Sequence, residues 1–388
     1  MMPTFTPFRL VPALCGGILA LGLAACGSDR PFEKPAELQP LVANKVETSI
    51  LWKTEIGTPM KKYSTSQLQL ALEENLLFAA SEDGVVTALS TRDGRPVWQV
   101  RTEKRIASGP RLAGSLLLLG TYDGQVLALD KETGKQVWLE RVGSEVLASP
   151  VGNATLVVAR SHDGKLHAIK PKDGSRLWSF DRSLPLLTVR GMGAPVMTPN
   201  LVVMGLDVGK VIAVSNLDGI PVWEQTLSNA EGKSEIERLS DVDAEPLVVG
   251  DDVYVGSFSG AFAAISLPSG RVLWKRDLVS VKQAAVDAEH VFVTTRDSAV
   301  VCLDRIGGIS LWKQDAFKLR GLTSPLVMQG HVVLGDYEGY VHFLNPDSGD
   351  VVGRVSAAGD AIVAPLVANG GTIFALTADA DVVAISVQ

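Results

Sequence analysis

The feature that most constrains the fold of this chain is a motif that recurs along most of its length. One copy runs from Ser81 to Trp98 and reads SEDGVVTALSTRDGRPVW, and the next runs from Thr121 to Trp138 and reads TYDGQVLALDKETGKQVW. A fixed period of about 40 residues predicts a propeller or an array in which each unit is one small sheet. Eight copies of the third strand of the unit can be counted, and they begin near Val85, Gln125, Lys165, Lys210, Ala261, Ala299, Tyr340 and Asp381.

Each unit contains short apolar strands separated by turn residues. In the second copy, the apolar run 116–120 precedes the turn Asp123-Gly124, and the alternating segment 126–129 precedes the turn 132–134 and the Trp strand 137–139. Strands separated by Asp-Gly and Thr-Gly turns are typical of successive hairpins, because glycine adopts the positive φ that such turns need. The pattern predicts four antiparallel strands in each unit.

A tryptophan lies four residues after the glycine of the second turn in six units. These pairs are Gly94 and Trp98, Gly134 and Trp138, Gly174 and Trp178, Gly219 and Trp223, Gly270 and Trp274, and Gly308 and Trp312. A large aromatic side chain at such a repeated place is expected to pack between neighbouring sheets, with stacking against a ligand as the alternative. The seventh unit has Gly353 where the tryptophan is expected, so it lacks this anchor.

The two ends of the repeat complement each other. The last copy, 380–386, reaches the C-terminus without a Trp strand, whereas the first tryptophan, Trp52, has no strands of its own unit before it. We therefore expect the N-terminal strand to complete the last blade and to close the ring, which removes open sheet edges. The predicted fold is an all-β, eight-bladed β-propeller with four antiparallel strands per blade over residues 48–388.

The N-terminus reads as a targeting segment. Arg9 precedes an apolar run, 10–25, that is too short to span a bilayer and ends in small residues. The sequence Leu23-Ala-Ala-Cys26 resembles the bacterial lipoprotein box, which implies removal of a signal peptide, residues 1–25, and acylation of Cys26 (palmitate among the chains). Gly27 after the cysteine resembles the outer-membrane class of these lipoproteins. The alternative is an ordinary secretory signal in which Cys26 is incidental.

The segment 26–47 contains Pro31, Pro35 and Pro40 and no repeat, so we expect it to be a lipidated tether between the membrane and the ring. Of the three cysteines, Cys15 would leave with the signal peptide and Cys26 would be acylated. Cys302 would then be the single thiol of the mature chain, and its apolar strand predicts a buried residue.

Two longer spacings point to the functional region. The intervals from Trp178 to Trp223 and from Trp223 to Trp274 exceed the period, and the excess falls in segments 181–191 and 227–243. Both segments follow a Trp strand, so both are expected to connect the outer strand of one blade to the inner strand of the next. Such connections lie on one face of a propeller, and function in this fold resides in its loops.

The two insertions would together form one surface. The first contributes apolar Leu187 and Val189 with cationic Arg190, and the second contributes Asp241 and Asp243. An apolar patch bordered by charges of both signs is typical of a protein-docking site. In the alternative interpretation, Arg190 pairs with Asp241 or Asp243 and only closes the loops.

The sequence lacks the usual signatures of catalysis. The five histidines show no metal-ligand spacing, and neither Gly-x-Ser-x-Gly nor a phosphate loop occurs. The pair Asp241 and Asp243 is a weak signal for calcium. The net charge of −7 and the lack of a basic block argue against nucleic acid as a partner. We therefore predict no catalytic residue, no metal and no cofactor.

The repeat Ala-Leu/Ile-x-x-x-x-Gly-x-x-x-Trp resembles the repeats of the pyrroloquinoline-quinone propeller superfamily. Together with the lipoprotein box, the length and the eight units, it makes the whole chain resemble the BamB family, lipoproteins of the outer-membrane β-barrel assembly (BAM) machinery. The most specific matches are 189–191 and 235–243.

The resemblance implies a non-enzymatic scaffold on the periplasmic face of the outer membrane of a Gram-negative bacterium. Such a scaffold docks on the periplasmic POTRA domains of BamA, and through BamA on the other BAM lipoproteins, to assist the folding and insertion of barrel proteins. By position, Leu187, Val189, Arg190, Asp241 and Asp243 take the docking roles, with Val189 where the family usually has Leu. Direct contact with nascent outer-membrane proteins is left open.

Two other classes are alternatives. A quinoprotein dehydrogenase of the same superfamily would be longer and would use a vicinal cysteine pair with calcium ligands, and this chain has no adjacent cysteines. A lipid-anchored propeller that senses a ligand or binds peptides is the second alternative, and the sequence disfavours it only weakly.

Overall fold

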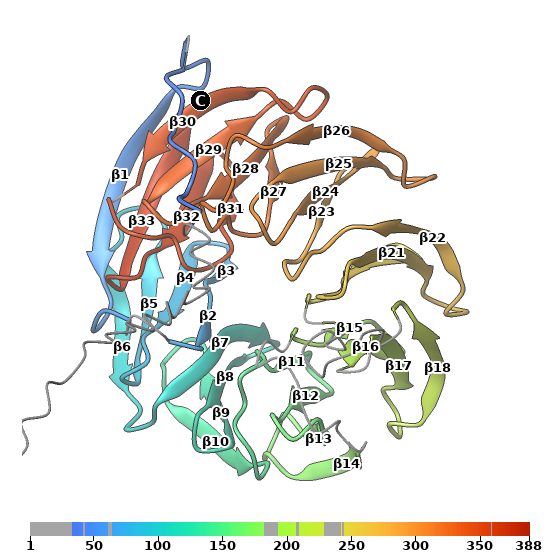
Figure 1. Ribbon diagram of the computed structural model, residues 1–388. Helices are drawn as coiled ribbons and strands as arrows, with labels where there is room; N and C mark the ends of the chain where they lie inside the picture. Colours follow the sequence, from blue (N-terminus) through green and yellow to red (C-terminus); the bar gives the residue numbers. More distant parts are fainter. Residues whose placement is uncertain are drawn as a thin grey trace, which may run out of the picture. The chain divides into compact units, whose positions relative to one another are not determined.

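The computed structural model describes residues 33–41, 43–60, 64–181, 193–206, 209–228, 242, 244–357 and 359–388. Within these residues the chain forms eight small antiparallel sheets arranged as blades in a ring (Figure 1). The predicted all-β, eight-bladed propeller with four antiparallel strands per blade is therefore confirmed. The blades follow one another around the ring in sequence order, from blade 1 near the N-terminus to blade 8 at the C-terminus.

Blades 1 to 4 cover the first half of the repeat. Blade 1 consists of β3 (Ala71–Glu73), β4 (Leu76–Ala80), β5 (Val85–Ser90) and β6 (Pro96–Arg101). Blade 2 consists of β7 (Ile106–Ala113), β8 (Leu116–Thr121), β9 (Gln125–Asp130) and β10 (Gln136–Arg141). Blade 3 consists of β11 (Val151–Gly152), β12 (Val157–Arg160), β13 (Leu166–Ile169) and β14 (Arg176–Phe180). Blade 4 consists of β15 (Val196–Met197), β16 (Leu201–Leu206), β17 (Lys210–Ser215) and β18 (Pro221–Thr226).

Blades 5 to 8 complete the ring. Blade 5 consists of β19 (Leu247–Val249), β20 (Asp252–Gly256), β21 (Ala261–Ser266) and β22 (Val272–Asp277). Blade 6 consists of β23 (Ala285–Val286), β24 (His290–Thr294), β25 (Val300–Asp304) and β26 (Ser310–Gln314). Blade 7 consists of β27 (Leu326–Met328), β28 (His331–Gly335), β29 (Tyr340–Leu344) and β30 (Val351–Ser356). Blade 8 consists of β31 (Val367–Asn369), β32 (Thr372–Leu376), β33 (Asp381–Val387) and β1 (Thr48–Glu55).

Blade 8 closes the ring as predicted. Its outermost strand is β1, which pairs antiparallel with β33 from Thr48 opposite Val387 to Glu55 opposite Asp381. Figure 1 shows the N-terminal and C-terminal strands side by side in this blade. Pairing the two ends of the chain leaves β33 with a partner on both sides, so the ring has no open seam.

One strand was not expected. The short strand β2 (Gln67–Leu68) pairs with β7 in parallel, so blade 2 has a fifth, innermost strand. The chain between β1 and β3 passes close to the inner edge of blade 2 on its way to blade 1, which brings these two residues beside Ser108 and Gly109.

The tryptophans join seven of the eight blades to the next, which confirms their predicted packing between sheets. In seven blades the indole Nε1–H donates to the carbonyl oxygen that opens the second turn of the following blade, at 2.7 Å from Trp138 to Pro171 and at 3.1 Å from Trp52 to Thr91. The ring lies against the glycine of the same turn. A Cβ atom on Gly134 would lie 2.7 Å from Cε3 of Trp98, and the φ of this glycine is 70°, so no other residue fits there.

The structure explains why blade 7 has Gly353 where the other blades have a tryptophan. It stands opposite Phe343, whereas the tryptophan of another blade stands opposite a small residue, as Trp98 does opposite Ala88. Blade 8 has no covalent second turn on which a tryptophan of blade 7 could pack, because its outer strand is supplied by the N-terminal segment. That segment fills the space instead, and a Cβ atom on Gly353 would lie 2.9 Å from both Asn44 and Val46.

Residues 36–46 fall within the segment expected to be a tether, and they are bound to the loop before blade 7 and to its outer strand. The Ala36 N–H donates to the Lys318 carbonyl at 2.9 Å, and the Lys45 N–H donates to the Val352 carbonyl at 2.8 Å. Val46 is buried in a cluster with Phe343 and Val383.

The core lies in the two middle strands of each blade. All six residues of β8 are buried, while the outer strand β10 is mostly exposed or half-buried. Cys302 is fully buried in β25 as predicted, and burial raises the pKa of its thiol to about 12.

Candidate functional site

The residues predicted to dock a partner, Leu187, Val189, Arg190, Asp241 and Asp243, lie outside the described residues, as does the predicted lipidation site Cys26. The described residues on either side of the two insertions nevertheless fix where the insertions begin and end.

Both insertions leave an outer strand and enter an inner strand. The first connects β14 with β15, and the second connects β18 with β19. In a four-stranded antiparallel blade, the connection to the next blade lies at the same end as the turn between the second and third strands. All such connections therefore lie on one face of the ring, which we call the insertion face. The turns between the third and fourth strands lie on the other face, the turn face.

The end of the second insertion is anchored on blade 4. Val242 is buried, and its N–H donates to the Leu206 carbonyl at 3.1 Å. The Val242 side chain packs against Gly205, where a Cβ atom would lie 2.5 Å from its Cγ1. This glycine allows the close approach of the insertion to the end of β16.

An ion pair spans the ring just after this anchor. Arg111 lies in β7 of blade 2, and Glu245 lies immediately before β19 of blade 5. Their side chains meet at 2.5 Å and are 24% and 20% exposed. This pair could not be predicted from the sequence, because the two residues are 134 positions apart and no spacing rule connects them.

Arg111 and Glu245 line a cavity of about 880 Å³. The cavity is lined mainly by the segments that precede the innermost strands of all eight blades, so it lies on the ring axis at the insertion face, and we call it the axial cavity. Its volume falls in the range of about 300–1,000 Å³ that is typical of small-ligand sites. Its polar wall includes the following side chains: Ser66, Gln67, Gln69, Ser149, Thr323 and Ser324.

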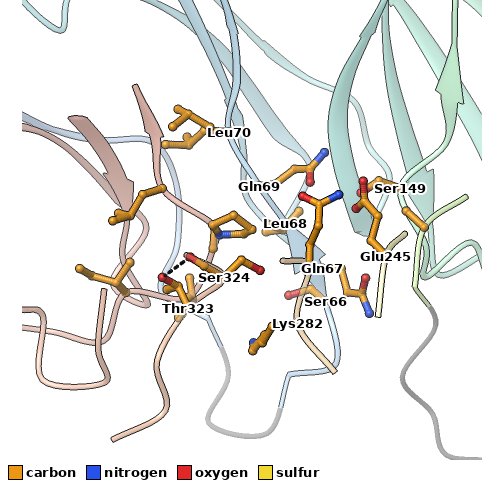
Figure 2. A pocket seen from close by; sticks show the side chains of 18 of the residues that line it. Ser66, Gln67, Leu68, Gln69, Leu70, Ser149, Glu245, Lys282, Thr323 and Ser324 are labelled. Carbon is orange, nitrogen blue, oxygen red and sulfur yellow. Dashed lines mark hydrogen bonds between the residues drawn. The ribbon is translucent and has the colours of Figure 1, made fainter. Parts of the chain in front are cut away.

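Figure 2 shows Gln67, Glu245 and Lys282 around this same space. Lys282 lies in the connection between β22 and β23, and its side chain is exposed to the solvent of the cavity. No described residue forms an ion pair or hydrogen bond with its ammonium group that would offset its charge. The surrounding protein lowers the pKa of Lys282 through burial, and no neighbouring carboxylate opposes this effect.

A second cluster of charged groups lies in and beside blade 7. Asp336 and His342 are fully buried, with Nε2 of His342 2.9 Å from Oδ2 of Asp336, and Arg320 donates to the same oxygen at 2.7 Å. Burial acts to raise the pKa of Asp336, but hydrogen bonds from His342 and Arg320 hold that pKa below its usual value. Burial lowers the pKa of His342 despite the nearby carboxylate.

This cluster has a structural role. The Arg320 Nη1–H donates to the Ala36 carbonyl at 3.0 Å, and the Arg354 Nη1–H donates to the Gln39 carbonyl at 3.2 Å. Arg354 belongs to this cluster because its Nε–H donates to Nδ1 of His342 at 3.2 Å. The cluster therefore holds Ala36 and Gln39 of the N-terminal segment on blade 7. Since Asp336 and His342 have no exposed surface, a substrate could not reach them.

The sequence contains a signal for this cluster that was not used. Asp336 occupies the place where other blades have a serine or threonine whose side chain accepts a backbone N–H four residues later, as Thr295 does from Ala299. A carboxylate in that buried place requires a cation, and aligning the eight units would have pointed to it.

Other chemistry is sparse in the part of the chain that the structure describes. No group of three or more His, Cys, Asp or Glu side chains there could hold a metal ion. Among the same residues, no helix has the length and apolar character needed to cross a membrane.

Comparison with known proteins agrees with this geometry. A family model described as outer membrane protein assembly factor BamB matches residues 82–314 and 297–388. A relative from Alkalilimnicola ehrlichii with the same description is 45% identical over 377 residues, which cover 97% of this chain and 96% of the relative.

Two solved structures are informative. The crystal structure of BamB from Moraxella catarrhalis matches with a TM-score of 0.76 and 28% identity, covering 86% of this chain and all of that chain. A quinohemoprotein alcohol dehydrogenase from Pseudomonas putida matches with a TM-score of 0.70 but only 13% identity, covering 87% of this chain and 76% of that one. The second likeness shows a shared fold alone.

Proposed function

The chain belongs to the BamB family of outer membrane protein assembly factors, and from this premise we propose that it is a non-enzymatic, lipid-anchored scaffold that docks on the periplasmic POTRA domains of BamA. Docking on BamA would bring the propeller to the other lipoproteins of the BAM complex and to the site where barrel proteins fold and insert. The proposal places the ring on the periplasmic face of the outer membrane, held there by acyl chains on Cys26.

The observation that carries the proposal is the place of the two insertions. They are two of the three longest departures from the repeat, beside the connection from β1 to β3, and both arise from connections on the insertion face. The repeated residues of the blades are used in the contacts between blades, tryptophans included. We therefore assign partner binding to the insertions, which lie outside the repeat. A shared face allows both insertions to contact one partner at the same time.

Each docking residue has a chemical role in the proposal. Leu187 and Val189 would bury apolar area in the centre of the interface, and Arg190 would form charge-assisted hydrogen bonds with the partner or hold the acidic loop. Asp241 and Asp243 flank Val242 in the sequence, and Val242 itself is buried against blade 4.

Two observations favour the scaffold over a quinoprotein dehydrogenase. The relative from Alkalilimnicola is matched over nearly its whole length, whereas the dehydrogenase shares the fold at 13% identity. The chain also lacks the adjacent cysteines that the sequence analysis associates with the quinone site. An absorbance spectrum of the purified protein tests this choice, because a bound quinone chromophore would contradict it.

The proposal is tested by a pull-down of the BamA periplasmic domains with Arg190→Glu. Reversal of an interfacial charge should cost at least about 2–5 kcal/mol, so binding should weaken by a factor of ~30 or more. Arg271→Glu is the matched control, because Arg271 is an exposed arginine after the blade 5 turn on the turn face. Normal thermal melting with lost binding only for Arg190→Glu supports docking. Normal binding by Arg190→Glu removes Arg190 from the interface, and a collapsed melt indicates that Arg190 mainly closes its own loop.

A further inference from the structure

Among the residues that the structure describes, the wall of the axial cavity carries one positive charge without a partner. Its described charged side chains are Arg111, Glu245 and Lys282, and the first two neutralise each other in their ion pair. Lys282 is left without a counter-charge, in a protein whose net charge is −7. The described wall of the cavity thus has the opposite sign to the molecule as a whole.

The Lys282 side chain is exposed to the water of the cavity, but the protein walls around it stabilise a charge less well than bulk water does. The lowered pKa of Lys282 reflects this cost. A cation of this kind inside a concave site of ligand size is a pattern found at functional sites. A bound anion would supply the missing counter-charge through a charge-assisted hydrogen bond.

The other wall groups indicate which anion fits. A phosphate usually draws several cations or a cluster of backbone N–H groups, and the cavity has one free cation among its described residues. A carboxylate has one charge and two oxygens. The Lys282 ammonium can donate to one carboxylate oxygen. The amide of Gln67 or the hydroxyl of Ser66 can donate to the other oxygen. Leu68 and Leu70 provide apolar wall for the rest of the ligand.

We propose that the axial cavity binds a ligand that carries a carboxylate, with Lys282 as the group that recognises it. Lys282, Gln67 and Ser66 lie outside the docking insertions, so variants of these residues test the carboxylate site separately from the scaffold function. The carboxylate can belong to a free organic acid or to an acidic side chain of a polypeptide, and two probes distinguish these sources.

The test is isothermal titration calorimetry on the mature full-length lipoprotein in detergent micelles. One probe is succinate, and the other is the acetylated and amidated pentapeptide Gly-Phe-Glu-Phe-Gly, with its Gln counterpart as the uncharged control. Binding of succinate alone assigns the site to small acids, and binding of the Glu peptide but not the Gln peptide assigns it to polypeptides. Either result supports the carboxylate site, and failure of both probes to bind overturns it.

Variants of Lys282 identify the recognising group. Lys282→Gln should weaken binding at least tenfold, while Lys282→Arg, which keeps the charge, should stay within a fewfold of the wild type. Lys135→Gln, an exposed lysine of the blade 2 turn, is the matched control and should bind normally. Equal binding by wild type and Lys282→Gln overturns the proposal.

Thermal melting without ligand gives a second readout. Because a charge without a described partner is removed from the cavity wall, Lys282→Gln should melt at or above the wild-type temperature. A clearly lower melting temperature would show that the ammonium has a structural partner within the ring, and this result would also overturn the proposal.

Discussion

Replacing Trp138 by alanine tests how the blades are held together. Trp138 is 6% exposed, and its ring lies on Gly174 of blade 3. Its Nε1–H donates to the Pro171 carbonyl at 2.7 Å. The side chain therefore contributes both apolar burial and a hydrogen bond to the contact between two blades.

The expected loss follows from these two contributions. Truncating a buried aromatic side chain to alanine costs about 3–5 kcal/mol, because the transfer free energy is lost and a cavity remains. Trp138→Phe keeps most of the buried area but leaves the Pro171 carbonyl without its donor, which should cost about 1–3 kcal/mol. The two variants together separate the packing from the hydrogen bond.

The assay is equilibrium unfolding in urea, with the midpoint and the slope both measured. The control is Val137→Ala, since Val137 is the neighbouring residue and is 44% exposed, so its loss should stay within about 0.5 kcal/mol. A loss below about 1 kcal/mol for Trp138→Ala, with an unchanged slope, would refute the role of Trp138 as an anchor between blades.

Three further results are expected. Cys26→Ser should give a stable protein that is released from the membrane fraction, because the ring does not need its lipid to fold; retention of this variant in the outer membrane would contradict the lipid anchor. Gly353→Val should lose about 1–3 kcal/mol and free the N-terminal segment for limited proteolysis, because the new side chain would overlap Asn44 and Val46. Burial and the nearby Arg176 lower the pKa of His167 to about 4, so the unfolded chain takes up a proton more readily than the fold between about pH 6.5 and pH 4. Stability should therefore fall by about 2–3 kcal/mol as the pH drops from 7 to 4.5, and urea unfolding of His167→Gln should lack this part of the fall.

Much of the fold could be predicted because the repeated residues are the ones that form the turns and the contacts between blades. The spacing from Gly134 to Trp138 fixes both the turn and the anchor, and the surplus tryptophan Trp52 reveals how the ring closes. The strand β2 could not be predicted, because two residues, Gln67 and Leu68, carry no periodic pattern. It exists only because the chain passes close to the inner edge of blade 2.

The candidate site was predictable only in part, for a similar physical reason. Insertions appear as a break in the period, so the loops that carry Arg190 and Asp241 could be found from spacing. The axial cavity could not, because Arg111, Glu245 and Lys282 come from three different blades and meet only when the ring closes. The sequence showed that blade 7 has Gly353 instead of a tryptophan. It did not indicate that Val46 of the N-terminal segment fills the space that the tryptophan would occupy.

Photo-cross-linking in living cells shows whether the insertion face docks on BamA. A p-benzoylphenylalanine residue is placed at position 189 on the first insertion, and at position 217 as the control, because Leu217 is 87% exposed on the turn face. A cross-link to BamA is expected from position 189 and none from position 217. A cross-link from position 217 alone, or equal cross-links from both positions, would contradict it.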